Sequence, residues 1–294
     1  MSYAEALTGP VFQRKPAFPH EVYLPGPDLV RVVDIALALG RPLLLQGEPG
    51  CGKTRLAHHV AYRMGFDLEV ATVKSTSRAQ DLLYTYDAVR RLFDAELGAS
   101  GPVNKKGEPL ARSAANYVEF RALGRAIRRS GGDRRSVVLI DEIDKADLDF
   151  PNDLLQELDR MEFQVPEISE TWFRAEAERP FVIITHNEEK PLPPAFLRRC
   201  VYHYVEFPSA EQAEAILRAH GLPGELTGPA IHVVERLREL DLNKKPGLAE
   251  LIDWVRYQEI SGADPAALAA VPDIEALLKD RTDQTRVRRN PPAS

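Results

Sequence analysis

Over the first two thirds of the chain, segments with the helical spacing of hydrophobic residues alternate with short apolar runs typical of strands, and this pattern predicts an α/β domain. Segments with helical spacing, such as residues 28–39 before Gly40, separate short apolar runs. Five runs are interpreted as strands, at residues 42–46, 68–73, 137–140, 181–187 and 201–207. Apolar runs without a polar face are typical of strands in a parallel sheet that helices cover on both sides. We therefore predict a three-layer sandwich around a mainly parallel five-stranded sheet.

The strand pattern stops at Pro208, and the rest of the chain has helical periodicity only. Ser209 is a good N-cap for the next helix, and further helices are predicted at about 228–240, 248–260 and 273–279. The predicted organisation has four parts: an N-terminal arm at 1–27, an α/β nucleotide-binding domain at 28–208, a helical lid at 209–280 and a disordered tail at 281–294. The proline-rich arm is expected to be extended, covering either an adenine base or only core.

Three stretches of the α/β domain are less regular. Residues 82–86 bring leucines and tyrosines together, which suits either core or an inserted loop that presents them to a partner. Helices are expected at about 116–130 and 151–161, and a hairpin is expected just before Phe181. Arginines 128, 129, 134 and 135 surround a Gly-Gly pair, which suits a solvated loop, with nucleic-acid contact as the alternative.

A phosphate-binding loop follows the first strand, with the sequence GEPGCGKT at residues 47–54. Glycines allow a tight turn whose backbone N–H groups face phosphate oxygens at a helix N-terminus. Lys53 is then expected to reach the terminal phosphates, and the Thr54 hydroxyl to bind Mg²⁺. The predicted nucleotide-binding residues are Gly47, Glu48, Pro49, Gly50, Cys51, Gly52, Lys53, Thr54 and Arg55.

Two later strands end in polar residues. The apolar run 137–140 leads into Asp141 and Glu142, and the strand from Phe181 leads into Asn187. Because open α/β sheets bind ligands at the carboxyl ends of their strands, these side chains are expected at one edge. Asp141 is assigned to the magnesium shell, Glu142 to the orientation of a water molecule, and Asn187 to a hydrogen bond with that water or the terminal phosphate.

Composition limits the class of protein. The net charge is -6 and the sequence pI about 5.7, so there is no general basic surface for nucleic acid. Two cysteines suit a reducing compartment, no apolar run is long enough for a membrane helix, and no signal peptide is evident, so a cytoplasmic protein is expected. The histidines and cysteines lack zinc-ligand spacing.

The chain resembles the AAA+ ATPases, and within them the MoxR family, over about residues 24–260. The segments that carry the resemblance are LPGPDLVRVVDIALALGRPLLLQGEPGCGKT, VVLIDEIDKAD, IITHNEE, PPAFLRRC and KKPGLAELIDW. The irregular stretch after the second strand and the hairpin before Phe181 are similar to the two insertions of that family. The resemblance implies a homo-oligomeric, hexameric ring with ATP and Mg²⁺ between subunits.

Site roles follow from the resemblance. Residues 47–54 become the Walker A loop, Asp141 and Glu142 the Walker B pair, and Asn187 the sensor 1 residue. Arg199, with Arg198 as neighbour or substitute, becomes the arginine finger that acts on the adjacent subunit's nucleotide. The lid departs from the pattern: residues 244–247 read KKPG, without an arginine at the sensor 2 position, and Lys245 is the candidate substitute.

The resemblance implies a chaperone or remodeller that assists maturation, assembly or metal-cofactor insertion of a client protein, beside a von Willebrand factor A-domain protein. A nucleic-acid motor or clamp-loader subunit is the alternative, although no DNA-binding appendage is present. A small-molecule kinase fits less well, because Glu142, Asn187 and the arginine pair suit water as the acceptor. Use of GTP is disfavoured because Asn243-Lys244-Lys245-Pro246 lacks the aspartate that reads guanine.

Overall fold

The computed structural model describes residues 2–9, 21–130, 135–168, 172–176 and 178–289. Contacts within the chain group it into two units. The first unit comprises Met1–Pro19, Arg31–Leu45 and Val60–His203, and the second His20–Val30, Gln46–His59 and Tyr204–Ser294. The phosphate loop thus groups with the helical C-terminal part and not with the sheet, because its backbone packs on the lid, as described below. The domain boundary at residue 208 stays a prediction.

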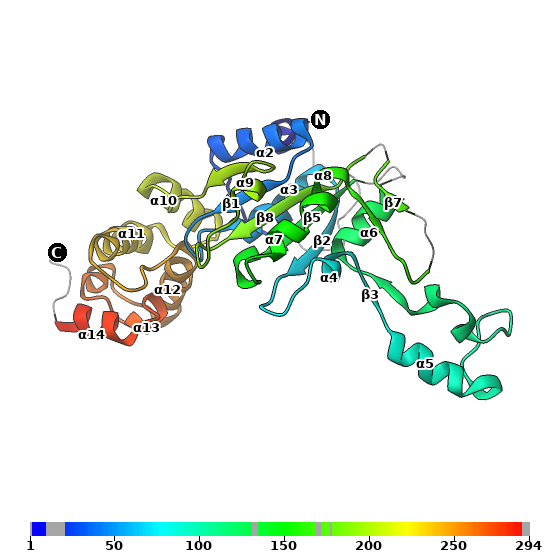
Figure 1. Ribbon diagram of the computed structural model, residues 1–294. Coiled ribbons are helices and arrows are strands. Elements are labelled where there is room, and N and C mark those ends of the chain that lie inside the picture. Colours follow the sequence, from blue (N-terminus) through cyan, green and yellow to red (C-terminus); the bar gives the residue numbers. More distant parts are fainter. Residues whose placement is uncertain (1, 10–20, 131–134, 169–171, 177, 290–294) are drawn as a thin grey trace. The chain divides into compact units, whose positions relative to one another are not determined.

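A five-stranded sheet with the order β2–β5–β8–β1–β9 forms the centre of the first unit (Figure 1). Its strands are β1 (Leu43–Gln46), β2 (Asp67–Thr72), β5 (Ser136–Asp141), β8 (Phe181–His186) and β9 (Val201–Tyr204). The β2–β5 and β5–β8 pairs are parallel, with Ile140 opposite Ile184. Every residue of β8 is buried, as is β5 up to Ile140, which explains the lack of a polar face in these runs. The predicted fold class is confirmed.

Nine helices precede or alternate with these strands among the described residues, and all but α5 lie near the sheet (Figure 1). They are α1 (Tyr3–Thr8), α2 (Pro27–Leu39), α3 (Lys53–Met64), α4 (Gln80–Leu83), α5 (Ala88–Glu96), α6 (Ala122–Arg129), α7 (Phe150–Asp153), α8 (Leu155–Arg160) and α9 (Pro194–Leu197), with 3-10 turns at Gly98–Ser100, Leu110–Arg112, Ala114–Tyr117 and Ile143–Lys145. The core packs Val138 and Ile140 of β5 against Leu123 and Ile127 of α6. The helix predicted at 151–161 is two short helices that meet at Leu154.

Two antiparallel strand pairs lie outside the main sheet. Strands β3 (Tyr84–Tyr86) and β4 (Val118–Phe120) form one, and β6 (Glu162–Gln164) and β7 (Trp172–Arg174) form the other. The second pair is the hairpin predicted before Phe181, which is confirmed. The helix predicted at 116–130 is wrong in its first part, because Val118–Phe120 pairs with β3 and the helix begins only at Ala122.

The two pairs share an aromatic cluster, which we define as Tyr84, Phe120, Phe163 and Phe173. Phe163 stacks on Phe173 with ring centroids 5.2 Å apart, and Phe120 meets Phe173 edge-on at 5.3 Å. Tyr84 stacks on Phe163 at 6.4 Å, and its hydroxyl donates to Glu167 at 3.1 Å. The cluster therefore ties both insertions to each other and to the main core.

The leucine and tyrosine stretch at 82–86 is core at its start. Leu82, Leu83 and Tyr84 are each at most 5% exposed, which confirms the core interpretation for them. The helix that follows is different: Val89, Leu92 and Phe93 of α5 are 60–80% exposed. Figure 1 shows the segment that carries α5 extending away from the sheet of its own unit.

The N-terminal arm, residues 1–27, was predicted to be extended, but part of it is helical. Residues Tyr3–Thr8 form α1, which Ser2 caps with a capping box, and Tyr3 is fully buried. The Tyr3 N–H donates to Asp34 of α2, and Arg63 of α3 donates to the Leu7 carbonyl at 2.5 Å. These contacts favour a docked helix over an extended arm. Residues 10–20 of the arm lie outside the described residues.

The second unit contains the helical lid. Its elements are α10 (Ala210–Ala219), α11 (Gly224–Glu239), α12 (Leu248–Ser261), α13 (Ile274–Leu277) and α14 (Arg281–Arg289), with a 3-10 helix at Pro265–Ala270. Ser209 and Gln212 form a capping box at the start of α10, as Ser209 predicted. Trp254 is fully buried at the centre of the lid core. Within the described ranges, no helix has the length and apolarity to cross a membrane.

The prediction of a disordered tail from residue 281 is wrong for residues 281–289, which form α14. Val287 is buried in the lid core. Asp283, which is 2% exposed, accepts hydrogen bonds from the backbone N–H groups of Asn243 and Lys244 at 3.1 and 2.9 Å. The arginine-rich composition suggested a solvated segment, but these two inward side chains attach it. The final residues, 290–294, are outside the described part.

We predict that Asp283→Ala destabilises the lid, because it leaves two backbone donors without their acceptor. The free energy of unfolding should fall by about 1–3 kcal/mol, and the amides of α14 should exchange with deuterium faster. Asp253→Ala, at an exposed position of α12, serves as the control. Equal thermal stability of the two variants would contradict this prediction.

Candidate functional site

The phosphate loop connects β1 to α3 in the second unit, and its shape depends on glycine. Gly47 has φ of 154°, and a Cβ there would lie 2.4 Å from the Val205 carbonyl oxygen, so no other residue fits without displacing backbone. Gly52 also has positive φ, and a Cβ there would meet the Tyr23 ring at 3.3 Å. The glycine spacing read from the sequence is therefore required by the backbone. Tyr23 also packs on His59 of α3.

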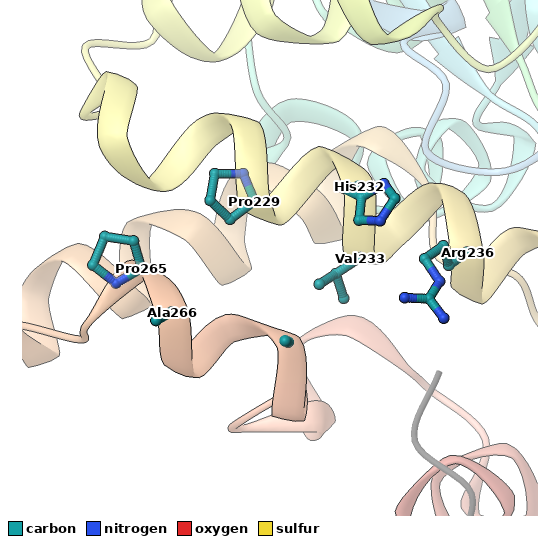
Figure 2. Close-up of a pocket in the computed structure, with 7 residues that line it drawn as sticks. Pro229, His232, Val233, Arg236, Pro265 and Ala266 are labelled. Carbon is teal, nitrogen blue, oxygen red and sulfur yellow. The ribbon is translucent and has the colours of Figure 1, made fainter. Parts of the chain in front are cut away.

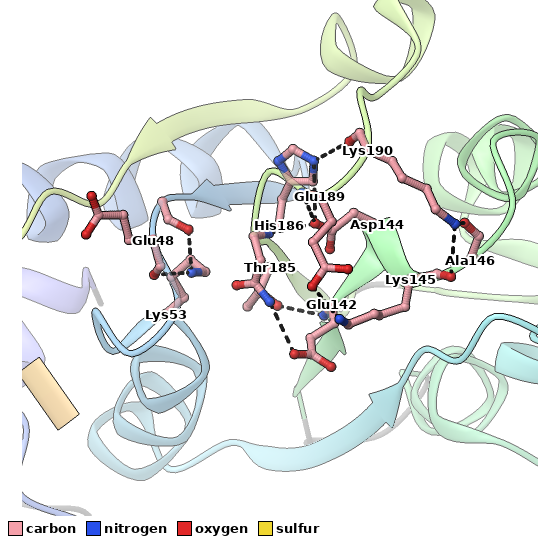
Figure 3. Close-up of polar contacts among 12 residues, drawn as sticks. Glu48, Lys53, Glu142, Asp144, Lys145, Ala146, Thr185, His186, Glu189 and Lys190 are labelled. Carbon is pink, nitrogen blue, oxygen red and sulfur yellow. Dashed lines mark hydrogen bonds and ion pairs between the residues drawn. The ribbon is translucent and has the colours of Figure 1, made fainter. Parts of the chain in front are cut away.

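Lys53 is the first residue of α3 and is 5% exposed. Its ammonium group donates to the carbonyl oxygens of Gly47 and Glu48, both at 2.8 Å (Figure 3). The loop thus holds the lysine charge against its own backbone, at the N-terminal end of a helix that favours anions. Burial raises the pKa of the neighbouring Cys51 thiol, so this cysteine stays protonated and is a packing residue.

The carboxyl ends of β5 and β8 carry the second set of predicted residues, in the first unit. The Thr185 hydroxyl donates to Asp141 Oδ1 at 2.7 Å and accepts from the Glu142 N–H at 2.8 Å. Asn187 Nδ2 donates to Glu142 Oε1 at 3.2 Å (Figure 3). The structure therefore brings Asp141, Glu142 and Asn187 together through short contacts between two adjacent strands.

Glu142 adopts a left-handed backbone conformation, with φ of 59° and ψ of 54°. This conformation costs a non-glycine residue roughly 1–2 kcal/mol, and residues held in it are enriched at functional sites. It turns the chain between the end of β5 and the 3-10 turn Ile143–Lys145. The adjacent carboxylates have different partners, because Asp141 accepts from Thr185 and Glu142 accepts from Asn187. The two carboxylates can then have separate roles, as the sequence suggested.

Asp144 organises the loop after β8, although no role was predicted for it. Its side chain is fully buried, and its Oδ2 accepts from the backbone N–H groups of Asn187 and Glu189, both at 3.0 Å. His186 contacts the Lys190 carbonyl at 2.8 Å, and Lys190 in turn donates to the Ala146 carbonyl at 2.7 Å. These bonds fix the backbone that carries Asn187. Thr185 was also assigned no role from the sequence. Its position, two residues before Asn187 in a buried strand, is the signal that could have identified it.

The two candidate finger arginines differ in their environment. Arg199 donates to Asp159 of α8 at 2.5 Å and to the Ala195 carbonyl at 3.0 Å, whereas Arg198 is exposed. Burial raises the pKa of Cys200 to about 12, so its thiol is protonated at neutral pH. Both arginines are accessible to solvent: Arg198 lies at an exposed position, and the Arg199 side chain is 40% exposed although it pairs with Asp159.

The arginines around residue 130 have intramolecular partners. Arg129 pairs with buried Glu69 at 2.7 Å, Arg128 lies over the Phe120 ring at 3.9 Å, and Arg135 donates to the Arg179 carbonyl at 2.8 Å. Arg134 lies outside the described residues. Arg128 and Arg129 remain exposed to solvent despite these contacts, and residues 131–134 lie outside the described part, so the solvated loop and the nucleic-acid contact both stay predictions.

The donor atoms suit Mg²⁺, because hydroxyl and carboxylate oxygens are the ligands that this ion prefers. Thr54 is in α3, in the second unit, and Asp141 ends β5, in the first. Lys245, the candidate sensor 2 substitute, is exposed on the turn before α12. Arg55 is also exposed and forms an ion pair with Glu21 at 3.4 Å.

The lid has a separate apolar groove between α11 and the 3-10 helix at Pro265–Ala270 (Figure 2). It is lined by Pro229, His232, Val233, Arg236, Pro265, Ala266 and Ala269. None of these residues belongs to the phosphate loop or to the strand ends, so we do not assign the nucleotide to this groove.

Comparison with known proteins agrees with these motifs. The family model "AAA domain (dynein-related subfamily)" matches residues 42–200. The chain is 27% identical to Protein NorQ of Paracoccus denitrificans (strain Pd 1222) over 225 residues, which cover 74% of this chain and 72% of NorQ. It is also 30% identical to the Nucleoside-triphosphatase THEP1 of Aquifex aeolicus (strain VF5) over 115 residues, 36% of this chain and 62% of that protein.

We predict that Thr185→Val slows nucleoside-triphosphate hydrolysis and leaves nucleotide affinity close to that of the wild type. Valine keeps the shape but removes the hydroxyl, so the Asp141 carboxylate and the Glu142 backbone N–H each lose a fixed partner. A decrease in kcat of about tenfold is expected, from the loss of about 1.4 kcal/mol. Thr185→Ser, which keeps the hydroxyl, is the control and should retain most activity; an unchanged kcat in the valine variant would refute the role.

Proposed function

Because this chain belongs to the AAA domain family, in its dynein-related subfamily, we propose that it is a Mg²⁺-dependent ATPase of the MoxR type that remodels a client protein. The observation that carries the proposal is the contact of Glu142 with Asn187 beside Asp141. This arrangement provides two carboxylates and an amide at the ends of adjacent parallel strands, where α/β sheets bind ligands. This arrangement suits water as the acceptor of the terminal phosphoryl group.

In the proposed reaction, backbone N–H groups of residues 47–54 bind the phosphates, and Lys53 exchanges its contacts with loop carbonyls for phosphate oxygens. Bound Mg²⁺, held through Thr54 and Asp141, would neutralise charge on the phosphates. Glu142 orients and polarises the attacking water, and Asn187 fixes the Glu142 carboxylate.

We further propose that the active form is a homo-oligomeric, hexameric ring. The exposed guanidinium of Arg198 is the better candidate for the arginine finger, since Arg199 is bound to Asp159. A finger supplied in trans contributes about 10³ to 10⁵ in rate. An isolated subunit should therefore hydrolyse ATP poorly.

The proposed role is that of a chaperone for maturation, assembly or metal-cofactor insertion, together with a von Willebrand factor A-domain protein. The similarity to NorQ along 74% of the chain supports the MoxR-type assignment. The insertions support a client role, because α5 exposes Val89, Leu92 and Phe93. The free, buried thiols of Cys51 and Cys200 fit a reducing compartment, and we propose the cytoplasm.

We predict opposite defects for two variants of the site. Lys53→Ala should abolish ATP binding, because the loop loses the ammonium group that is expected to contact the phosphate oxygens. Glu142→Gln should bind ATP but hydrolyse it at least about 10²-fold more slowly, because the amide cannot polarise water. Binding is measured with a fluorescent ATP analogue and turnover by phosphate release. Tight ATP binding by the first variant, or normal turnover by the second, would contradict the assignment.

The same pair of variants tests the client role. Glu142→Gln with ATP is expected to trap the client, and Lys53→Ala is the matched control that cannot enter the ATP state. Proteins recovered from the native cell with the first and not the second are the candidates, identified by mass spectrometry. A metalloenzyme or an A-domain protein supports the proposal, whereas nucleic acid or replication proteins would point to the motor alternative.

We predict that Arg198→Ala lowers kcat by about 10³-fold with ATP affinity unchanged, because the finger acts on the transition state. Arg199→Ala breaks an ion pair whose side chains are 40% and 45% exposed, so it should cost little stability, under about 1 kcal/mol. Turnover per subunit should also rise with protein concentration. Normal turnover in Arg198→Ala, together with a loss in Arg199→Ala, would reassign the finger to Arg199.

A further inference from the structure

An ion pair between the phosphate loop and a lid residue outside the predicted motifs lies within the second unit. Arg238, near the end of α11, donates from Nη2 to Glu48 Oε2 at 2.7 Å. The Arg238 side chain is 15% exposed and that of Glu48 is 39% exposed. The contact is charge-assisted, and its guanidinium side is largely withdrawn from solvent.

Arg238 is held in place by two further contacts. Its Nη1 donates to the Pro246 carbonyl, in the turn before α12, at 2.8 Å. Its guanidinium lies 4.2 Å from the centre of the Phe207 ring, in the segment that leads from the sheet into the lid. One side chain therefore connects α11, the start of α12 and the entry to the lid with the phosphate loop. The planar guanidinium can make these contacts at once, which a lysine cannot.

The lid backbone also touches the loop directly. The Ala249 N–H, in the first turn of α12, donates to the Gly50 carbonyl at 3.3 Å. Gly247, which precedes the helix, is packed so closely that a Cβ there would lie 2.9 Å from the Pro49 carbonyl oxygen. The loop segment 48–50 therefore contacts the lid through both a side chain and its backbone.

Glu48 contributes both a backbone and a side-chain group to these contacts. Its backbone carbonyl holds the Lys53 ammonium group, and its carboxylate puts a negative charge on the phosphate loop itself. Without a partner this charge would repel the phosphates. Arg238 neutralises it and at the same time fixes the backbone on which Lys53 depends.

We propose that Arg238 is a positioning residue for the nucleotide: it couples the lid to the phosphate loop through Glu48 and removes the electrostatic penalty of that carboxylate. This inference rests on the proposed ATPase function. It also accounts for the KKPG sequence at residues 244–247, because the lid then supplies its arginine to the loop from α11 and not from the start of α12. Movement of the lid would change the position of Glu48, and with it the group that holds Lys53.

The test is the affinity for a fluorescent ATP analogue, measured with the full chain carrying Glu142→Gln so that the nucleotide stays intact. Arg238→Ala should raise the Kd about tenfold, because Glu48 is left unpaired beside the phosphates. Adding Glu48→Gln to Arg238→Ala should restore most of the affinity, because the repelling charge is gone. Arg236→Ala, two residues away on α11 and part of the separate groove, should leave the Kd unchanged.

If Arg238 had only a structural role, a second substitution at Glu48 would not restore the ATP-analogue affinity that Arg238→Ala loses. The proposal is overturned if Arg238→Ala binds the analogue like the parent, or if the double variant binds more weakly than Arg238→Ala. If Arg238→Ala does not fold, Arg238→Gln replaces it in both comparisons. Failure of the parent chain to bind the analogue at all would overturn the ATPase function itself, whereas normal parental binding that depends on Lys53 isolates the role of Arg238.

Discussion

Complete burial of the central strands is the constraint on which the site depends. In β5 and β8, the runs 137–140 and 181–184 are apolar and buried on both faces, where a polar group would need a partner inside the protein. Polar side chains are placed only where these strands end, and parallel pairing brings those ends to one edge. The position of Asp141, Glu142 and Asn187 follows from this packing. Their chemistry is then a matter of a few side-chain contacts.

Those contacts come from residues that are not themselves expected to touch the nucleotide. Thr185 is 1% exposed, yet its hydroxyl bridges the Asp141 carboxylate and the Glu142 backbone. Asp144 holds the backbone on either side of the Asn187 loop in the same way. Each bond compensates the burial of a polar group and also restricts the geometry of a neighbour. The left-handed conformation of Glu142 is tolerated because this network determines the chain direction around it.

The sequence predicted the elements whose signal is local. Strands such as 137–140 and the glycine-rich loop at 47–54 were identified because apolar runs and glycine spacing directly reflect burial and backbone shape. Strand β4 was assigned to a helix, because three residues carry little periodicity and their partner β3 lies 32 residues away. Helix α14 was missed because its arginines dominate the composition, although Val287 and Asp283 face inward. Arg238 could not be assigned, since its partner Glu48 is 190 positions away.

The aromatic cluster of Tyr84, Phe120, Phe163 and Phe173 has a consequence for the dynamics of the insertions. Because rings from β3, β4, β6 and β7 pack on one another, neither strand pair can detach without exposing apolar surface of the other. Short two-stranded ribbons are marginally stable alone. The two insertions therefore form a single cooperative unit of local unfolding, and a force applied to the segment that carries α5 reaches the hairpin beside β8 through the same rings.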